Sequence, residues 1–423
     1  MTKGAPRFHA CTIGLLVAFA ACSRLPEAGQ PADARRSRAT IERLEKWLST
    51  EPADRPPLEK QVFARVALTR PDAAKAHELL LNDRVESIRE KRRAEWTDKV
   101  VRVGEYEMKF DYRSFGEKPE DGWDLYISLH GGGNTRPAVN DSAWRRHIRL
   151  YEPQQGIYLT PRAPTDTWDM WHQAHVDALF DRIIEGAIVH MGVNPNRVYL
   201  MGYSAGGDGV YQVAPRMADR WAAAAMMAGH PNDASPLGLR NIGFTLHMGA
   251  LDGAYNRNQV AAEWKEKLEA LRAQAPDGYV HEVQIHEGLG HGMRGKDAVA
   301  LDWMAQFTRT PLPSKIVWKQ DDVTHSRFYW LAVPEDSEKP GAEVVAQCDG
   351  QKIAISRASD VNALTIRLND RMLDLDKPVL VEWNGTRLFE GFAVRSVSTM
   401  SRTLKETIDP ELAFVAEITV ELK

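Results

Sequence analysis

The spacing of hydrophobic residues changes twice along the chain. Residues 40–98 carry apolar side chains at helical intervals, and Pro71-Asp72 marks the first turn of a long predicted helix. From residue 99 to 310, short β-favouring runs alternate with helical patterns, which is typical of a mostly parallel sheet covered by helices on both faces. Residues 311–423 alternate with a period of two instead. The pattern predicts a helical segment, an α/β domain and a C-terminal all-β, sandwich-like domain.

Individual elements follow from the same spacing. An antiparallel pair is expected over residues 100–110, and the next strands over 123–129, 156–160, 198–201, 222–228, 244–250 and 280–285. Helices are expected over 176–191, from the end of the 198–201 strand to Met217, and over 260–271 and 298–307. In the β domain, Asp349-Gly350 and Asn384-Gly385 predict hairpin turns, because these pairs adopt the backbone angles that tight hairpins need.

The first 22 residues have the pattern of an export signal. A cationic start precedes an apolar run over residues 13–21, which is too short to span a bilayer, and the run ends at Ala21-Cys22. This resembles a bacterial lipoprotein signal, which implies that Cys22 is lipidated and anchors the protein to a membrane of the cell envelope. The alternative is an ordinary secretory signal cleaved at the same place. Residues 23–39 are expected to form a polar linker.

Charge and cysteine content exclude some functions. The 423-residue chain has a net charge of −4 and no basic face is evident, so nucleic acid is not an expected partner. Its three cysteines are Cys11, Cys22 and Cys348. If Cys11 is removed with the signal and Cys22 is acylated, no intramolecular disulfide can form. The chain lacks the glycine motifs of dinucleotide or nucleotide sites, and no cofactor or metal is expected.

The most informative stretch joins a predicted strand to a predicted helix. Residues 198–201 are apolar, and Gly202-Tyr203-Ser204-Ala205-Gly206 follows as Gly-x-Ser-x-Gly. A serine exposed on a sharp strand-to-helix turn, known as a nucleophile elbow, needs small neighbours, since a side chain there would collide with the strand or the helix. The helix N-terminus also favours a developing negative charge. Ser204 is therefore a candidate nucleophile.

A second glycine-rich stretch follows the strand expected to lie beside the elbow strand. His130-Gly131-Gly132-Gly133 would let backbone N–H groups point at a carbonyl oxygen without side chains in the way. Together with the Ala205 N–H, the Gly131 and Gly132 N–H groups are candidates for an oxyanion hole.

A base and an orienting acid are expected further along the chain. Asp252 comes just after one predicted strand, and His291 lies in the glycine-rich loop after the next. The carboxyl ends of parallel strands share one edge of the sheet, which brings both residues to Ser204. Asp233, after the preceding strand, is the competing acid, but Pro231 intervenes. The chain order Ser, Asp, His is that of an α/β-hydrolase triad.

These residues resemble the α/β-hydrolase superfamily, and most of all exported esterases similar to polyhydroxybutyrate depolymerases and feruloyl esterases. The resemblance covers about residues 100–310 and rests on the two glycine stretches, on Asp252 and on Gly290-His291. It implies a serine esterase in which Ser204 is the nucleophile, His291 the base and Asp252 the acid, with a small-molecule or polymer-derived ester as substrate. Residues that could line its substrate pocket are His130, Tyr203, Trp168, Trp171 and His230.

Three other interpretations stay open from the sequence. A serine peptidase of the prolyl-oligopeptidase type would share the triad, although residues 40–98 are too few for the propeller such enzymes carry. A non-catalytic envelope protein could keep the fold for binding. His172 and His175 could bind a metal, but no third ligand is evident nearby.

Overall fold

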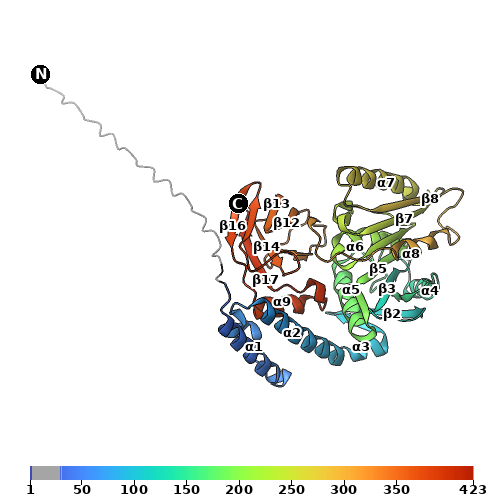
Figure 1. The fold of residues 1–423 in the computed structure, drawn as a ribbon. Coiled ribbons are helices and arrows are strands. Elements are labelled where there is room, and N and C mark those ends of the chain that lie inside the picture. Colours follow the sequence, from blue (N-terminus) through green and yellow to red (C-terminus); the bar gives the residue numbers. More distant parts are fainter. Residues whose placement is uncertain (2–28, 30, 423) are drawn as a thin grey trace.

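The computed structural model describes residues 1, 29 and 31–422. Residues 2–22 of the predicted signal, Cys22 among them, and residues 23–28 and 30 of the expected linker lie outside the described residues. Two lobes stand side by side, with three helices running along one edge of both (Figure 1). Within the described part of the chain, no helix has the length and apolar character needed to cross a membrane.

An eight-stranded sheet forms the centre of the larger lobe. Its strands are β1 (Val100–Val103), β2 (Tyr106–Phe115), β3 (Trp123–Leu129), β4 (Gly156–Pro161), β5 (Val193–Tyr203), β6 (Ala223–Met227), β7 (Gly243–Gly249) and β8 (His281–His286). They lie in the order β1-β2-β4-β3-β5-β6-β7-β8. The β1–β2 and β2–β4 pairs are antiparallel, and all other neighbours are parallel. This mostly parallel sheet, antiparallel only at its β1–β2–β4 edge, confirms the predicted α/β fold class.

Helices cover both faces of this sheet because alternate strand residues are apolar on opposite sides. Leu200 of β5 belongs to one buried cluster, with residues of α5 (Ala174–Gly186), α6 (Ala205–Arg216) and α7 (Arg257–Gln274). Its neighbour Met201 belongs to another cluster, with α8 (Val299–Met304). On that second face, His147 of α4 (Pro137–His147) contacts Ser128 of β3 at 2.8 Å.

The segment before the sheet is helical, as predicted. Its helices are α1 (Ala34–Leu48), α2 (Arg70–Lys91) and α3 (Arg93–Asp98), with short 3₁₀ turns between the first two. The first helix begins inside the expected linker because Asp33 caps it, its carboxylate accepting the Arg36 N–H at 2.8 Å. The second helix packs on α9 (Val397–Glu406) of the other lobe, so the segment contacts both domains rather than the sheet domain alone.

Two sheets make up the C-terminal lobe, which is the predicted all-β region with one added helix, α9. One sheet contains β10 (Arg327–Phe328), β11 (Leu331–Ala332), β14 (Ala363–Leu368) and β17 (Ala416–Glu421). The other contains β16 (Thr386–Gly391), β15 (Val379–Trp383), β13 (Lys352–Ser359), β12 (Glu343–Asp349) and β9 (Lys315–Lys319). Asn384-Gly385 joins β15 to β16 with both residues at positive φ, as its sequence predicts.

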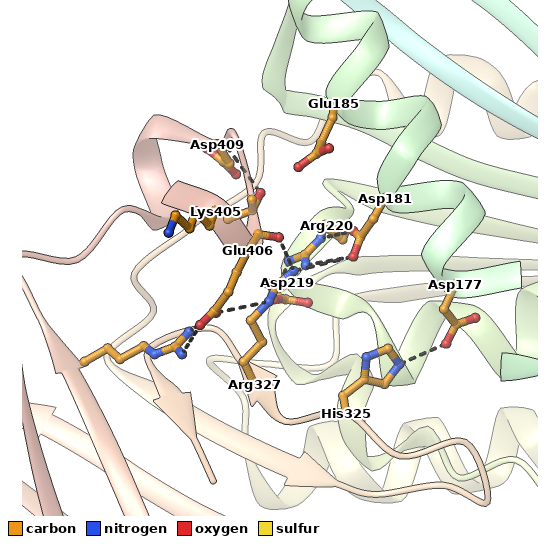
Figure 2. A network of polar contacts seen from close by, with 12 residues as sticks. Asp177, Asp181, Glu185, Asp219, Arg220, His325, Arg327, Lys405, Glu406 and Asp409 are labelled. Carbon is orange, nitrogen blue, oxygen red and sulfur yellow. Dashed lines mark hydrogen bonds and ion pairs between the residues drawn. The ribbon is translucent and has the colours of Figure 1, made fainter. Parts of the chain in front are cut away.

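Specific polar contacts hold the two lobes together (Figure 2). His325 of the β domain contacts Asp177 of α5 at 2.9 Å, and Arg327 contacts Asp219 at 3.4 Å. Beneath them, the apolar cluster continues from the sheet domain into the β domain without interruption. The β domain is therefore packed against the sheet domain in a defined orientation. The two domains share one hydrophobic core.

Candidate active site

Ser204 occupies a strained turn between β5 and α6. Its φ of 59° and ψ of −123° are unfavourable for a residue with a side chain. The backbone is held there because the Ser204 N–H donates to Met227 O at 2.9 Å and the Asp208 N–H donates to Ser204 O at 3.0 Å. A Cβ on Gly206 would collide with the carbonyl group of Leu129. The predicted sharp strand-to-helix turn is thus present, with Ser204 at its strained position.

The candidate base and acid reach Ser204 from the two strand ends predicted for them. His291 Nε2 lies 3.0 Å from Ser204 Oγ, and His291 Nδ1 lies 2.7 Å from Asp252 Oδ2. The Asp252 side chain is only 2% exposed, whereas that of His291 is 43% exposed. A carboxylate only accepts hydrogen bonds, so Nδ1 carries the proton and Nε2 is free to accept the serine proton. The three side chains form one hydrogen-bonded chain.

The competing acid lies elsewhere. Asp233 Oδ1 accepts a hydrogen bond from Gln212 Nε2 at 3.1 Å, and the residue lines a separate cavity of about 230 Å³ at the domain junction, with Arg216 and Lys319. The geometry therefore favours Asp252 as the partner of His291.

The candidate oxyanion loop is held by buried side chains on both sides. A Cβ on Gly131 would meet Ser204 Cβ at 3.0 Å and Tyr203 O at 3.1 Å, so the loop passes tightly beside Ser204 at this position. Gly132 and Gly133 have φ of +126° and +85°. The Gly133 N–H donates to Oδ1 of the buried Asn140 at 3.0 Å. The Gly133 N–H is thus occupied by Asn140. The N–H groups of Gly131, Gly132 and Ala205 remain the expected donors to an oxyanion.

His130 was expected as a pocket residue, but it is fully buried beneath the loop. Its Nε2 accepts the Ala163 N–H at 3.1 Å, so its Nδ1 carries the proton and donates to Gly131 O at 2.7 Å. Burial lowers the pKa of His130 to about 4, which keeps the ring neutral near pH 7. His130 therefore orients the Gly131–Gly132 peptide rather than touching a ligand.

Two further pocket candidates are also corrected by the structure. Trp171 is fully buried and donates from Nε1 to His130 O at 2.9 Å, because it packs in the core below the loop. Tyr203 points toward the histidine loop: its hydroxyl donates to His291 O and accepts the Met293 N–H at 3.2 Å. Tyr203 thus ties the loop that carries His291 to the end of β5, next to Ser204.

A cavity of about 610 Å³ opens above Ser204. Trp168 and His230 line it, as predicted, and Trp168 is 60% exposed. The other lining residues are Gly132, Gly133, Asn134, Ala205, Asp208, Asn232, Tyr255, Asn256 and Arg257.

The sequence analysis did not single out Asn232, Tyr255 and Arg257 as cavity residues. The last two closely follow Asp252, and that proximity was an available signal. Burial raises the pKa of Asp208, whose carboxyl accepts the His230 N–H at 2.6 Å.

His172 and His175, the two histidines considered as metal ligands, both contact aromatic rings. His175 stacks on Tyr106 with ring centroids 3.7 Å apart, and His172 lies against Trp168. Among the described residues, no three side chains are grouped as a metal site would require.

Comparisons with known proteins give distant structural likenesses. No family model and no curated protein sequence matches the chain. A thermostable esterase superposes with a TM-score of 0.38 at 17% identity, over 50% of this chain and 62% of its own. The feruloyl esterase module from Clostridium thermocellum has a TM-score of 0.35 at 15% identity, over 48% of this chain and 83% of its own. LpqC, a poly(3-hydroxybutyrate) depolymerase from Bordetella parapertussis, has a TM-score of 0.36 at 15% identity, over 48% of this chain and 88% of its own. These likenesses are too distant to assign an activity to this chain.

Proposed function

We propose that this protein is a serine hydrolase that cleaves carboxylic esters through an acyl-enzyme. The observation that carries the proposal is the hydrogen-bonded chain from Asp252 through His291 to Ser204, at the floor of an open cavity. The strained elbow and the glycine loop beside it support the same conclusion, because acyl transfer needs an exposed nucleophile and fixed donors for the oxyanion.

Each group has one role in the proposed reaction. Ser204 Oγ attacks the ester carbonyl carbon while His291 Nε2 takes the hydroxyl proton. The backbone N–H groups of Gly131, Gly132 and Ala205 stabilise the tetrahedral oxyanion, and Asp252 stabilises the imidazolium. Collapse of the intermediate breaks the ester C–O bond, and His291 returns the proton to the leaving alcohol. Water then attacks the acyl-enzyme with His291 again as base, which releases the acid and regenerates Ser204.

A fluorophosphonate probe tests the nucleophile directly. We expect the wild type to be labelled on the peptide that contains Ser204 and the Ser204→Ala variant to remain unlabelled, with mass spectrometry locating the adduct. Equally poor labelling of the two proteins would contradict the proposal and favour a binding protein with this fold. A matched pair of p-nitrophenyl acetate and an acetyl p-nitroanilide separates an esterase from a peptidase, because only the ester should be hydrolysed at an appreciable rate.

We also propose that the enzyme is held at the cell envelope by acylation of Cys22. The support is the sequence pattern alone, a cationic start and a short apolar run ending at Ala21-Cys22. Several acyl chains bind a membrane firmly, whereas a single chain binds only marginally. Cys22→Ser should therefore move the protein from the membrane fraction to the soluble fraction. Unchanged membrane retention of this variant would contradict lipidation.

A further inference from the structure

The loop that supplies the candidate acid also delivers a cation to the cavity. After Asp252 the backbone passes through Tyr255 and Asn256, whose φ values are 55° and 57°, and Arg257 then starts α7. Two successive non-glycine residues in the left-handed region are uncommon. Backbone strain of this kind is found most often at active sites and ligand-binding sites. As a result, the cavity above Ser204 is lined by all three residues of this turn: Tyr255, Asn256 and Arg257.

Arg257 has donors that the protein does not use. Its side chain is 12% exposed, and its ion pair within the described chain is to Asp252 Oδ1, at the outer distance of 4.0 Å. Its Nε is buried and has no hydrogen-bond partner among the described residues. The guanidinium lies over the Tyr255 ring, 4.8 Å from the centroid, which holds it by a cation–π contact. An arginine with a planar fork and free donors is suited to bind a carboxylate.

The rest of the cavity is compatible with an anion. Asn134 and Asn232 also line it and carry amide groups that can donate hydrogen bonds. Asp208 is the other carboxyl group on the wall, and one of its oxygens accepts the His230 N–H. Burial raises the pKa of Asp208, and the nearby Arg257 charge acts in the opposite direction. Arg257 is therefore the charged donor available to a substrate next to Ser204.

We propose that Arg257 determines specificity by binding a carboxylate carried by the ester substrate. This rests on the proposed function, since it names the substrate class of that same site. In this scheme Ser204 attacks the ester carbonyl of a molecule whose second, ionised acid group pairs with the guanidinium. A charge-assisted contact of this kind corresponds to about a 10- to 100-fold preference over a neutral substrate of the same shape.

The competing explanation is that Arg257 only restrains Asp252. The two roles differ in what they do to neutral esters. Loss of a restraint on Asp252 slows every ester equally, because all use the same triad. Loss of an anion site slows only the charged ester.

The test uses two pairs of rigid esters that differ in charge alone. 4-Acetoxybenzoate and 4-acetoxybenzamide place the charge on the alcohol, and phenyl 4-carboxybenzoate and phenyl 4-carbamoylbenzoate place it on the acyl group. For at least one pair, we expect wild-type kcat/KM to be at least tenfold higher for the anion. Arg257→Gln should lower that ratio by about 10- to 100-fold, and Arg257→Lys, which keeps the charge, should retain part of it. The preference of the wild type should also weaken as salt is raised, because the arginine is not fully buried.

Two results would overturn the inference. One is a wild-type ratio within threefold of unity for both pairs, and the other is a ratio that Arg257→Gln leaves unchanged. As a readout that needs no turnover, terephthalate should slow fluorophosphonate labelling of the wild type more than terephthalamide does, and this difference should disappear in Arg257→Gln. Normal labelling of Ser204 with no such difference rejects the anion site alone, whereas absence of labelling rejects the proposed function. Thermal unfolding of the variants confirms that they are folded.

Discussion

Replacing Asp252 by asparagine tests the proposed mechanism most sharply, because it preserves shape and removes the charge. In the native site the carboxylate accepts the proton on His291 Nδ1 across 2.7 Å, which leaves Nε2 as an acceptor for Ser204 Oγ at 3.0 Å. An asparagine amide can donate to Nδ1 instead. The imidazole would then carry its proton on Nε2, facing the serine, and could not act as a base.

The buried position of Asp252 makes this effect large. Its side chain is 2% exposed, so little solvent compensates for the lost negative charge when the imidazolium forms. Loss of the orienting acid lowers turnover by up to about 10⁴ in triad enzymes, equivalent to ~5.5 kcal/mol of transition-state stabilisation. Asp252 does not line the cavity, so KM should change little. Initial rates with p-nitrophenyl butyrate over a range of concentrations separate the two constants.

Asp233→Asn is the matched control, because it makes the same chemical change at the competing position. Asp233 contacts Gln212 at 3.1 Å and lines the cavity at the domain junction rather than the one above Ser204. Its kcat should stay within a few-fold of wild type. If Asp233→Asn proves the more damaging variant, or Asp252→Asn keeps more than about a tenth of the activity, the acid assignment is refuted even if Ser204 is still labelled.

Two further outcomes are expected from the buried polar groups. Tyr203→Phe removes the hydroxyl that joins His291 O to the Met293 N–H, so kcat should fall by about tenfold at nearly constant KM; a change in KM alone would indicate a ligand contact instead. Below about pH 6.5 the free energy of unfolding should fall by roughly 1.4 kcal/mol per pH unit for each buried neutral histidine. Burial lowers the pKa of His130 to about 4 and that of His247 to about 3, so the unfolded state binds protons that the folded state does not. Chemical denaturation between pH 7 and pH 5 measures this slope, and a flat profile would contradict it.

The sheet and the order of its functional residues were predictable because they depend on local and general rules. Short apolar, β-favouring runs that alternate with helical patterns predict the strands. Parallel strands bring their carboxyl ends to one edge, which predicts that Asp252 and His291 lie near Ser204. The elbow was predictable because few residues other than glycine tolerate its crowding. The geometry at Ser204, Asp252 and His291 follows these rules closely.

Side-chain burial around the cavity was not predictable in the same way. Trp168 and Trp171 are three residues apart in one loop, yet the first is exposed at the cavity and the second is fully buried. Which tryptophan faces outward depends on packing against residues distant in sequence. Arg257 is a similar case, since its position depends on the left-handed backbone at Tyr255 and Asn256. Asparagine is enriched in that conformation, but nothing about a tyrosine signals it. The start of α1 at Ala34 was missed because a single cap at Asp33 determined it.

Backbone strain in this molecule is concentrated around the cavity. Thirteen described non-glycine residues have positive φ, and five of these line the cavity: Asn134, Ser204, Asn232, Tyr255 and Asn256. Each such residue costs on the order of 1–3 kcal/mol and persists only where surrounding contacts impose it. In the loop after Asp252 these contacts include the Asn256 N–H donating to Gly253 O and the Asn258 N–H donating to Asp252 O, each at 3.1 Å. The cation–π contact with the Tyr255 ring then holds the Arg257 guanidinium at the wall of the cavity above Ser204. Selectivity by Arg257 should accordingly depend on where a substrate carries its charge, and not only on whether it carries one.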